Sequence, residues 1–210
     1  MNDPAVDGPT DSIEVVLTQS QALGLLGPGP IELHLDHARG FAKVLASGDR
    51  VLDLGSGGGL PGLVIGMERR DVTITLVDAG TRRVAFLRRA VRQLGISARV
   101  EVVHGRAETL ARRPELRELF DVVVARSFAV PAVTAECAAG FVRVGGRILV
   151  SEPPDAPARW DSAGLQQLGL IDDGPHRDAG LVLRILNKVV PISEVYPRSD
   201  GVPERRPLFT

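Results

Sequence analysis

The sequence has little of several features, and each scarcity excludes a class of protein. It holds one cysteine, Cys137, so neither an internal disulfide nor a cysteine-based metal site is possible. No long run of apolar residues occurs, which excludes a transmembrane helix and predicts no contact with a membrane. The formal net charge is −1, so the chain lacks the overall excess of basic residues that marks many nucleic-acid-binding proteins. Any RNA-binding site must therefore be a local patch.

Length and composition divide the chain into three parts. Residues 1–12 are polar and acidic, and we expect a disordered N-terminal tail. This tail lacks the basic start of a signal peptide, so we expect a cytoplasmic protein. The length of 210 residues fits one domain, which we place at residues 13–190. Residues 191–210 contain four prolines and little periodicity, and we expect an extended C-terminal arm there.

The most informative stretch is residues 50–62, which reads Arg-Val-Leu-Asp-Leu-Gly-Ser-Gly-Gly-Gly-Leu-Pro-Gly. Its apolar start is typical of a buried parallel strand, and Pro61 suits the first turn of a helix. The glycines between them allow a ligand to approach the backbone closely. A second apolar run, residues 72–77, ends in Asp78, where an acid can accept hydrogen bonds from ribose hydroxyls.

Strands and helices alternate along the chain, which predicts an α/β fold with a mostly parallel sheet. Two helices, at 13–26 and 31–45, precede the alternation. His34 and His37 fall in the second, and we expect surface or capping roles for them rather than catalysis. The remaining helices are expected at 61–69, 81–94 and 131–142. The strands are expected at 50–54, 72–77, 100–103, 120–125, 147–150, 165–171 and 181–186, and the last two have no helix between them.

One predicted helix is unusually basic. Residues 81–94 carry five arginines and no acid: Arg82, Arg83, Arg88, Arg89 and Arg92. Such a helix is either a solvated face or a surface that meets phosphates, and the sequence favours neither interpretation.

The spacing Gly55-x-Gly57-x-Gly59, with Asp53 two residues before it, resembles the first motif of class I S-adenosylmethionine (SAM) methyltransferases. A nicotinamide-binding turn would instead read Gly-x-Gly-x-x-Gly. The resemblance implies a Rossmann-like fold with a seven-stranded sheet, mostly parallel and closed by an antiparallel final strand. It also implies SAM as the cofactor, with no metal.

Further motifs are similar to one family within that class, the bacterial 16S rRNA guanine-N7 methyltransferases, also called glucose-inhibited division protein B. They are Val77-Asp78, Arg82-Arg-Val-Ala-Phe-Leu87, Gly105-Arg-Ala-Glu108 and Val124-Ala-Arg-Ser127, with Tyr196-Pro-Arg198, Gly201, Pro203 and Pro207-Leu208 in the tail. The resemblance covers roughly residues 31–208. The expected partner is 16S rRNA or the small ribosomal subunit.

The resemblance also implies roles for individual residues. Arg126 would lie at the mouth of the site as the catalytic residue that positions the guanine. Substrate contacts would come from Arg82, Arg83, Arg106 and Arg198. The cofactor would be bound by Asp53, Gly55, Gly57, Gly59, Leu60, Asp78, Ala107, Glu108 and Arg126.

The chain departs from the family pattern in places that concern the acceptor. The usual N-terminal Trp-Asn segment is missing, and Glu152 stands where the family has a lysine. A carboxylate there would repel RNA. Arg126 has an alternative interpretation, a structural ion pair with Glu152 or Asp53. The acceptor therefore stays open between rRNA, another nucleic acid and a small molecule, and a SAM-binding protein without transferase activity is a further alternative.

Overall fold

The computed structural model describes residues 12–155, 159–178 and 181–210. The predicted tail at 1–12 lies outside this part of the chain except for Ser12, whose side chain accepts a hydrogen bond from the backbone N–H of Val15 at the start of the first helix. The helices are α1 (Ile13–Ala22), α2 (Ile31–Lys43), α3 (Gly62–Glu68), α4 (Thr81–Gln93), α5 (Ala107–Leu110), α6 (Pro131–Ala139), α7 (Ser162–Gln167) and α8 (Val202–Arg205).

A seven-stranded sheet forms the centre of the molecule, in the order β3-β2-β1-β4-β5-β7-β6. The contacts between β1, β2, β3, β4 and β5 are all parallel, whereas β7 is antiparallel to both β5 and β6. This is the predicted architecture. The strands are β1 (Arg50–Leu54), β2 (Thr73–Asp78), β3 (Val100–His104), β4 (Phe120–Ala125), β5 (Val142–Glu152), β6 (Leu170–Asp178) and β7 (Leu181–Lys188).

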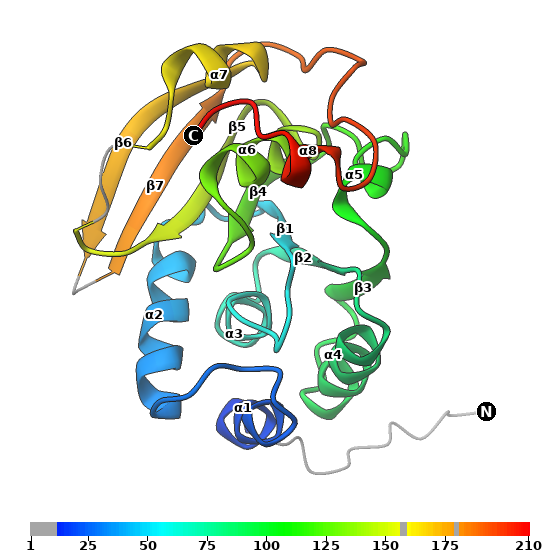
Figure 1. Cartoon of the computed structure of the whole chain (residues 1–210). Coiled ribbons are helices and arrows are strands. Elements are labelled where there is room, and N and C mark those ends of the chain that lie inside the picture. Colours follow the sequence, from blue (N-terminus) through cyan, green and yellow to red (C-terminus); the bar gives the residue numbers. More distant parts are fainter. Residues whose placement is uncertain (1–11, 156–158, 179–180) are drawn as a thin grey trace.

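Helices cover both faces of the sheet. Figure 1 shows α1, α2, α3 and α4 on one side and α5, α6, α7 and α8 on the other. Side chains of β1 alternate between these layers, as the two-residue period of a strand requires. Leu52 and Leu54 belong to the core that includes the α6 side chains, and Val51 belongs to the core that includes Phe86 of α4. Burial on both faces explains why β1 is a nearly continuous apolar run.

Most predicted elements are confirmed, and β1 and β4 have the predicted bounds. The predicted strand at 165–171 is wrong, because α7 occupies its first residues and β6 begins at Leu170. Asp161 caps α7 by accepting the N–H of Gly164. Gly169, with φ of +71°, then turns the chain into β6. β6 is an edge strand, which explains how it tolerates charged residues and Pro175.

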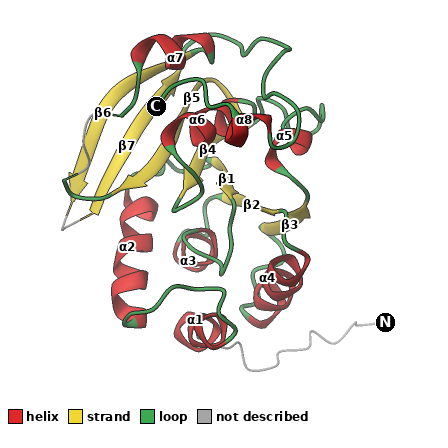
Figure 2. Cartoon of the chain, in the orientation of Figure 1, coloured by secondary structure: helices red, strands yellow, loops and turns green. Residues whose placement is uncertain are grey.

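The C-terminal arm, residues 191–210, follows β7 and runs back over α5 and α6 (Figure 1). It is loop apart from the short α8, as Figure 2 shows. Arg112 donates hydrogen bonds to the backbone oxygens of Glu194, Val195 and Pro197, and Arg117 donates one to that of Tyr196. These bonds hold the arm through its own carbonyl groups, and Ile192, Leu208 and Phe209 pack into the apolar core.

Candidate functional site

The glycine turn lies at the carboxyl end of β1, beside β4. The strand order reverses between β1 and β4, and ligands of open α/β sheets bind at such a switch point. Gly55 has a φ of +71°, which side-chain-bearing residues rarely adopt. A Cβ atom there would also lie 2.4 Å from Cδ2 of Phe128. The turn therefore requires glycine at position 55 for both its conformation and its space.

Asp78, at the end of β2, holds this turn in place. Its Oδ2 accepts the N–H of Gly57 at 2.9 Å, and its Oδ1 accepts the N–H of Gly80 at 2.7 Å. The guanidinium of Arg83 lies 3.6 Å from Oδ1. Each carboxylate oxygen can accept more than one hydrogen bond, so Asp78 keeps acceptor capacity for a ligand.

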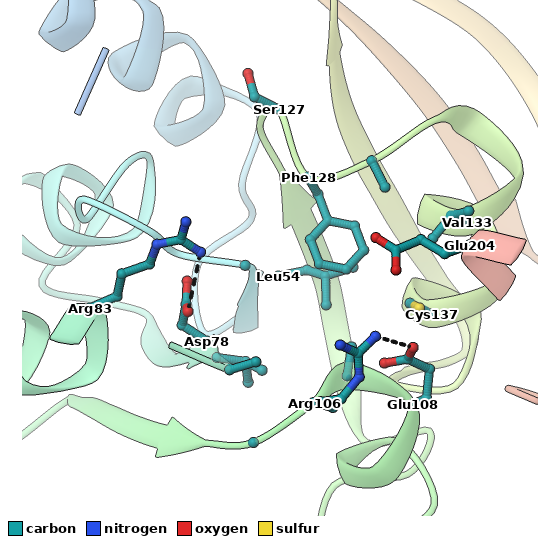
Figure 3. Close-up of a pocket in the computed structure, with 16 residues that line it drawn as sticks. Leu54, Asp78, Arg83, Arg106, Glu108, Ser127, Phe128, Val133, Cys137 and Glu204 are labelled. Carbon is teal, nitrogen blue, oxygen red and sulfur yellow. Dashed lines mark hydrogen bonds and ion pairs between the residues drawn. The ribbon is translucent and has the colours of Figure 1, made fainter. Parts of the chain in front are cut away.

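Two cavities meet at the turn. Cavity A, about 320 Å³, lies over the ends of β1, β2 and β3 and is drawn in Figure 3. Cavity B, about 340 Å³, lies between the turn and the loop that joins α1 to α2. Both volumes are within the range of small-molecule sites. Gly55, Arg83 and Ser127 line both cavities, so a ligand in one would adjoin a ligand in the other.

Ser127, just after β4, lies between two residues whose side chains line different cavities. It has a φ of +53°, an uncommon value for a residue other than glycine. Arg126, before it, lines cavity B, and Phe128, after it, lines cavity A. Figure 3 shows the Phe128 ring reaching into the middle of cavity A. Nothing in the sequence singled out Phe128, because its importance comes from its contact with Gly55 in the fold.

The far wall of cavity A is built by α5 and by the C-terminal arm. Glu108 Oε1 accepts hydrogen bonds from Arg106 at 2.7 Å and from the N–H of Gly201 at 2.9 Å. Burial alone would raise the pKa of Glu108, but its hydrogen bonds and the charge of Arg106 together lower the pKa below its ordinary value. Glu204 of α8 also lines the cavity (Figure 3). Sequence reasoning missed Glu204, although the tail motif around it was a signal that the arm matters.

Arg126 makes an unexpected contact. Its Nη2 lies 2.8 Å from Nδ1 of His34, while its Nη1 is buried without a hydrogen-bond partner. In the part of the chain that the structure describes, Arg126 forms no ion pair with Glu152 or Asp53. Burial lowers the pKa of Arg126, partly offset by the nearby charge of Asp53. The alternative interpretation of Arg126 as half of a structural ion pair is therefore wrong.

Two further titratable groups lie near Arg126. Asp53 is 1% exposed and lines neither cavity; its Oδ2 accepts the N–H of Gly62, and its Oδ1 has no partner. Burial raises the pKa of Asp53 to about 7. Burial also lowers the pKa of His37 to about 4, assisted by the charge of Arg126. His37 is half-buried, and its Nδ1 has no hydrogen-bond partner in the described part of the chain.

The predicted site residues fall into three groups. Gly55, Asp78, Ala107, Glu108 and Arg106 line cavity A, and Gly55, Gly57, Leu60 and Arg126 line cavity B. Arg83 reaches both. Asp53, Gly59, Arg82 and Arg198 line neither. Arg198, predicted to bind substrate, is instead paired with the fully buried Glu136 at 2.6 Å.

Glu152 does not face either cavity. Its Oε1 accepts hydrogen bonds from Arg159 at 3.0 Å and from the indole of Trp160 at 2.9 Å. Its side chain is only 5% exposed. The carboxylate is therefore neutralised inside the fold, which removes the expected repulsion of RNA. Cys137 lines cavity A as a packed thiol, and burial raises its pKa far above the ordinary value.

Comparison with known proteins identifies the family. The family model described as rRNA small subunit methyltransferase G matches residues 26–153. The chain belongs to this family. A ribosomal RNA small subunit methyltransferase G from Roseiflexus sp. is 39% identical over 166 residues, which cover 75% of this chain and 70% of the relative. The protein of that name from Lactobacillus delbrueckii subsp. bulgaricus is 35% identical, over 80% of this chain and 73% of the relative. The predicted family is thus confirmed, and with it a methyltransferase enzyme.

Solved structures show the same fold at lower identity. A protein from Klebsiella pneumoniae, provisionally named an O-methyltransferase, superposes with a TM-score of 0.57 at 15% identity, covering 87% of this chain and 92% of that one. A protein from Haemophilus influenzae, provisionally named a methylase, gives a TM-score of 0.54 at 15% identity, with 74% and 88% covered. At this identity the likeness concerns the fold alone.

The described residues lack two features. No helix among them is long and apolar enough to cross a membrane. They also contain no cluster of histidine, cysteine, aspartate and glutamate that could hold a metal ion.

Proposed function

We propose that this enzyme transfers a methyl group from SAM to N7 of a guanine in 16S rRNA, with SAM in cavity A and the acceptor guanine at cavity B. The observation that carries the proposal is the meeting of the two cavities at Gly55 and Ser127 in a chain of this family. An rRNA acceptor would also place the enzyme in the cytoplasm, with the small ribosomal subunit as its partner.

The residues of cavity A fit an adenosine ligand. The remaining acceptor capacity of Asp78 suits the ribose hydroxyls, and Ala107 and Glu108 would border the adenine. Gly55 leaves the backbone open to close approach. SAM supplies, when bound, an electrophilic methyl group on a sulfonium. Asp53 lies beneath the turn, so we assign it to holding Gly62 rather than to direct contact.

The acceptor side needs orientation more than proton transfer. N7 of guanine carries a lone pair in the plane of the base, so no general base is required. Holding two reactants in line can lower a barrier by roughly 7–11 kcal/mol. Arg126 at the wall of cavity B has the planar donor fork that suits a guanine edge or a phosphate. We therefore assign the positioning of the acceptor to Arg126.

The arginines of α4 would bind the RNA backbone. Arg82, Arg83, Arg88, Arg89 and Arg92 are all exposed. Of these five arginines, only Arg83 lies within ion-pairing distance of an acid in the described part of the chain. Unpaired exposed arginines beside a site attract phosphates and release counterions on binding. Arg106 is already bonded to Glu108, so we assign it to the wall of cavity A rather than to RNA.

The test is methyl transfer to small ribosomal subunits that lack the modification. The purified enzyme is incubated with subunits and SAM labelled in its methyl group, and the RNA is digested to nucleosides. We expect the label in 7-methylguanosine and in no other nucleoside, and no label when free guanosine replaces the subunit. Label in another nucleoside would contradict the proposed acceptor atom. No transfer, despite tight SAM binding, would favour another acceptor.

A further inference from the structure

His34 is the one side chain that hydrogen-bonds the guanidinium of Arg126 in the described part of the chain. Arginine can only donate, so Nδ1 of His34 must be the acceptor and carries no proton. The proton of the neutral ring is then on Nε2, which lies 3.2 Å from the carbonyl oxygen of Gly27. The two contacts define one tautomer and one ring orientation.

The carbonyl that receives the His34 proton is itself held. Gln21 of α1 donates from its Nε2 to the oxygens of Gly27 and Gly29, both at 2.9 Å. A chain of hydrogen bonds therefore runs from α1, through the loop at 27–30 and His34 on α2, to Arg126 at the end of β4. His34 and Gly27 also line cavity B beside Arg126.

A neutral partner has a specific consequence for Arg126. A carboxylate in the place of His34 would orient the guanidinium but would also cancel its charge. The imidazole orients the group and leaves that charge available to an incoming anion or base edge. The pKa of His37 is lowered to about 4, so this neighbouring imidazole is neutral and adds no second positive charge beside Arg126. The neighbouring acid, Asp53, forms no ion pair with Arg126, and its Oδ2 accepts the N–H of Gly62.

We infer that His34 is a positioning residue, which holds the guanidinium of Arg126 toward the acceptor nucleotide in cavity B while leaving its charge uncancelled. The inference rests on the proposed function, since it assumes that Arg126 meets the acceptor.

Three variants test this role by kinetics. His34→Leu removes the acceptor, and we expect kcat for methyl transfer to fall about tenfold to a hundredfold, because a misplaced positioning group has effects of that size. The KM for the ribosomal subunit should change little, because the arginines of α4 are untouched. His34→Asn keeps an oxygen near the place of Nδ1 and should restore most of kcat. His34→Leu combined with Arg126→Ala should be no slower than Arg126→Ala alone, because His34 acts through Arg126.

The inference would be overturned if the double variant lost kcat by the product of the two single losses. It would also be overturned if His34→Asn were as slow as His34→Leu at equal thermal stability. A second readout does not need activity. ¹⁵N NMR of the imidazoles, in a chain with four histidines, reports the tautomer of each ring, and loss of signals in His34→Asn assigns His34. We expect the Nε2–H form, with an Nδ1 shift that moves in Arg126→Ala. An Nδ1–H form would overturn the inference, whether or not the enzyme is active. Inactivity on ribosomal subunits would refute the proposed function instead.

Discussion

Arg198 and Glu136 join the C-terminal arm to the body of the protein. The Nε and Nη2 atoms of Arg198 and its backbone N–H all donate to the Glu136 carboxylate, at 2.6 to 3.2 Å. Glu136, on α6, is 0% exposed, so its charge depends on this partner. The contact holds the segment that carries Gly201 and Glu204 against cavity A.

Replacing Arg198 with alanine should therefore destabilise the protein and loosen the cofactor site. Removing one partner of a buried ion pair leaves an uncompensated charge, which typically costs about 3–5 kcal/mol. We expect a loss of that order in the free energy of unfolding, measured by urea denaturation, and weaker SAM binding. Arg198→Leu with Glu136→Leu should lose less than Arg198→Ala. Equal stability of Arg198→Ala and the wild type would show that Glu136 is not buried as described.

Asp78 should govern cofactor affinity. In Asp78→Ala the turn loses the acceptors for Gly57 and Gly80. If SAM binds as proposed, its ribose hydroxyls also lose a charged partner. A hydrogen bond to a charged group is worth about 1.5–3 kcal/mol, so we expect SAM and S-adenosylhomocysteine to bind roughly tenfold to a hundredfold more weakly. Calorimetric titration measures this. Asp173→Ala, on the exposed edge strand, is the matched control. Unchanged affinity in Asp78→Ala would remove Asp78 from the site.

Gly55→Ala should clash with Phe128. The added methyl would lie 2.4 Å from the ring, and its backbone would be held in the left-handed region, at a cost of about 1–2 kcal/mol. We expect lower stability and weak SAM binding. Phe128→Ala removes the clash but also the packing of its ring against the core, so the double variant should lose less stability than the sum of the two single losses. A double-mutant cycle measures the coupling, and simple additivity of the two changes would show that the residues do not touch.

How far the sequence could predict this structure depended on the range of the interactions. The glycine turn, the place of Asp78 at the end of β2 and the succession of elements along the chain come from local patterns, and these were predicted with few errors. Arg198 was misassigned because its partner, Glu136, is far away in sequence and looked like an ordinary helix residue. β6 was misplaced because an edge strand needs no apolar alternation. His34 was expected to have a surface or capping role, and Phe128 and Glu204 were not singled out, because the contact or cavity that each one meets comes from distant elements.

The buried Asp53 should make stability depend on pH. Its pKa is raised to about 7 in the folded protein, against an ordinary value of 3.8. Between these values the folded state binds more protons than the unfolded state, so the contribution of Asp53 to stability falls as pH rises through about 7. Asp53→Asn removes this dependence and keeps an acceptor for Gly62. We expect the variant to gain stability relative to the wild type between pH 5 and pH 8, with an upper limit on the order of 4 kcal/mol. Denaturant titrations of both proteins across this range measure the difference in their free energies of unfolding. If that difference becomes smaller as pH rises, Asp53 does not act as predicted.

The basic face of α4 should make RNA binding depend on salt. Arg82, Arg89 and Arg92 are exposed, and the helical period places them on one side of α4. If each neutralises a phosphate, replacing all three with alanine should make the slope of log affinity against log salt shallower by roughly 2, at about 0.7 per phosphate for single strands. SAM affinity should be unchanged, because none of the three lines cavity A. Arg113→Ala, in the exposed loop before β4, is the control for total charge. An equal change of slope per arginine in this control would mean that RNA binding follows net charge, and that α4 is only a solvated face.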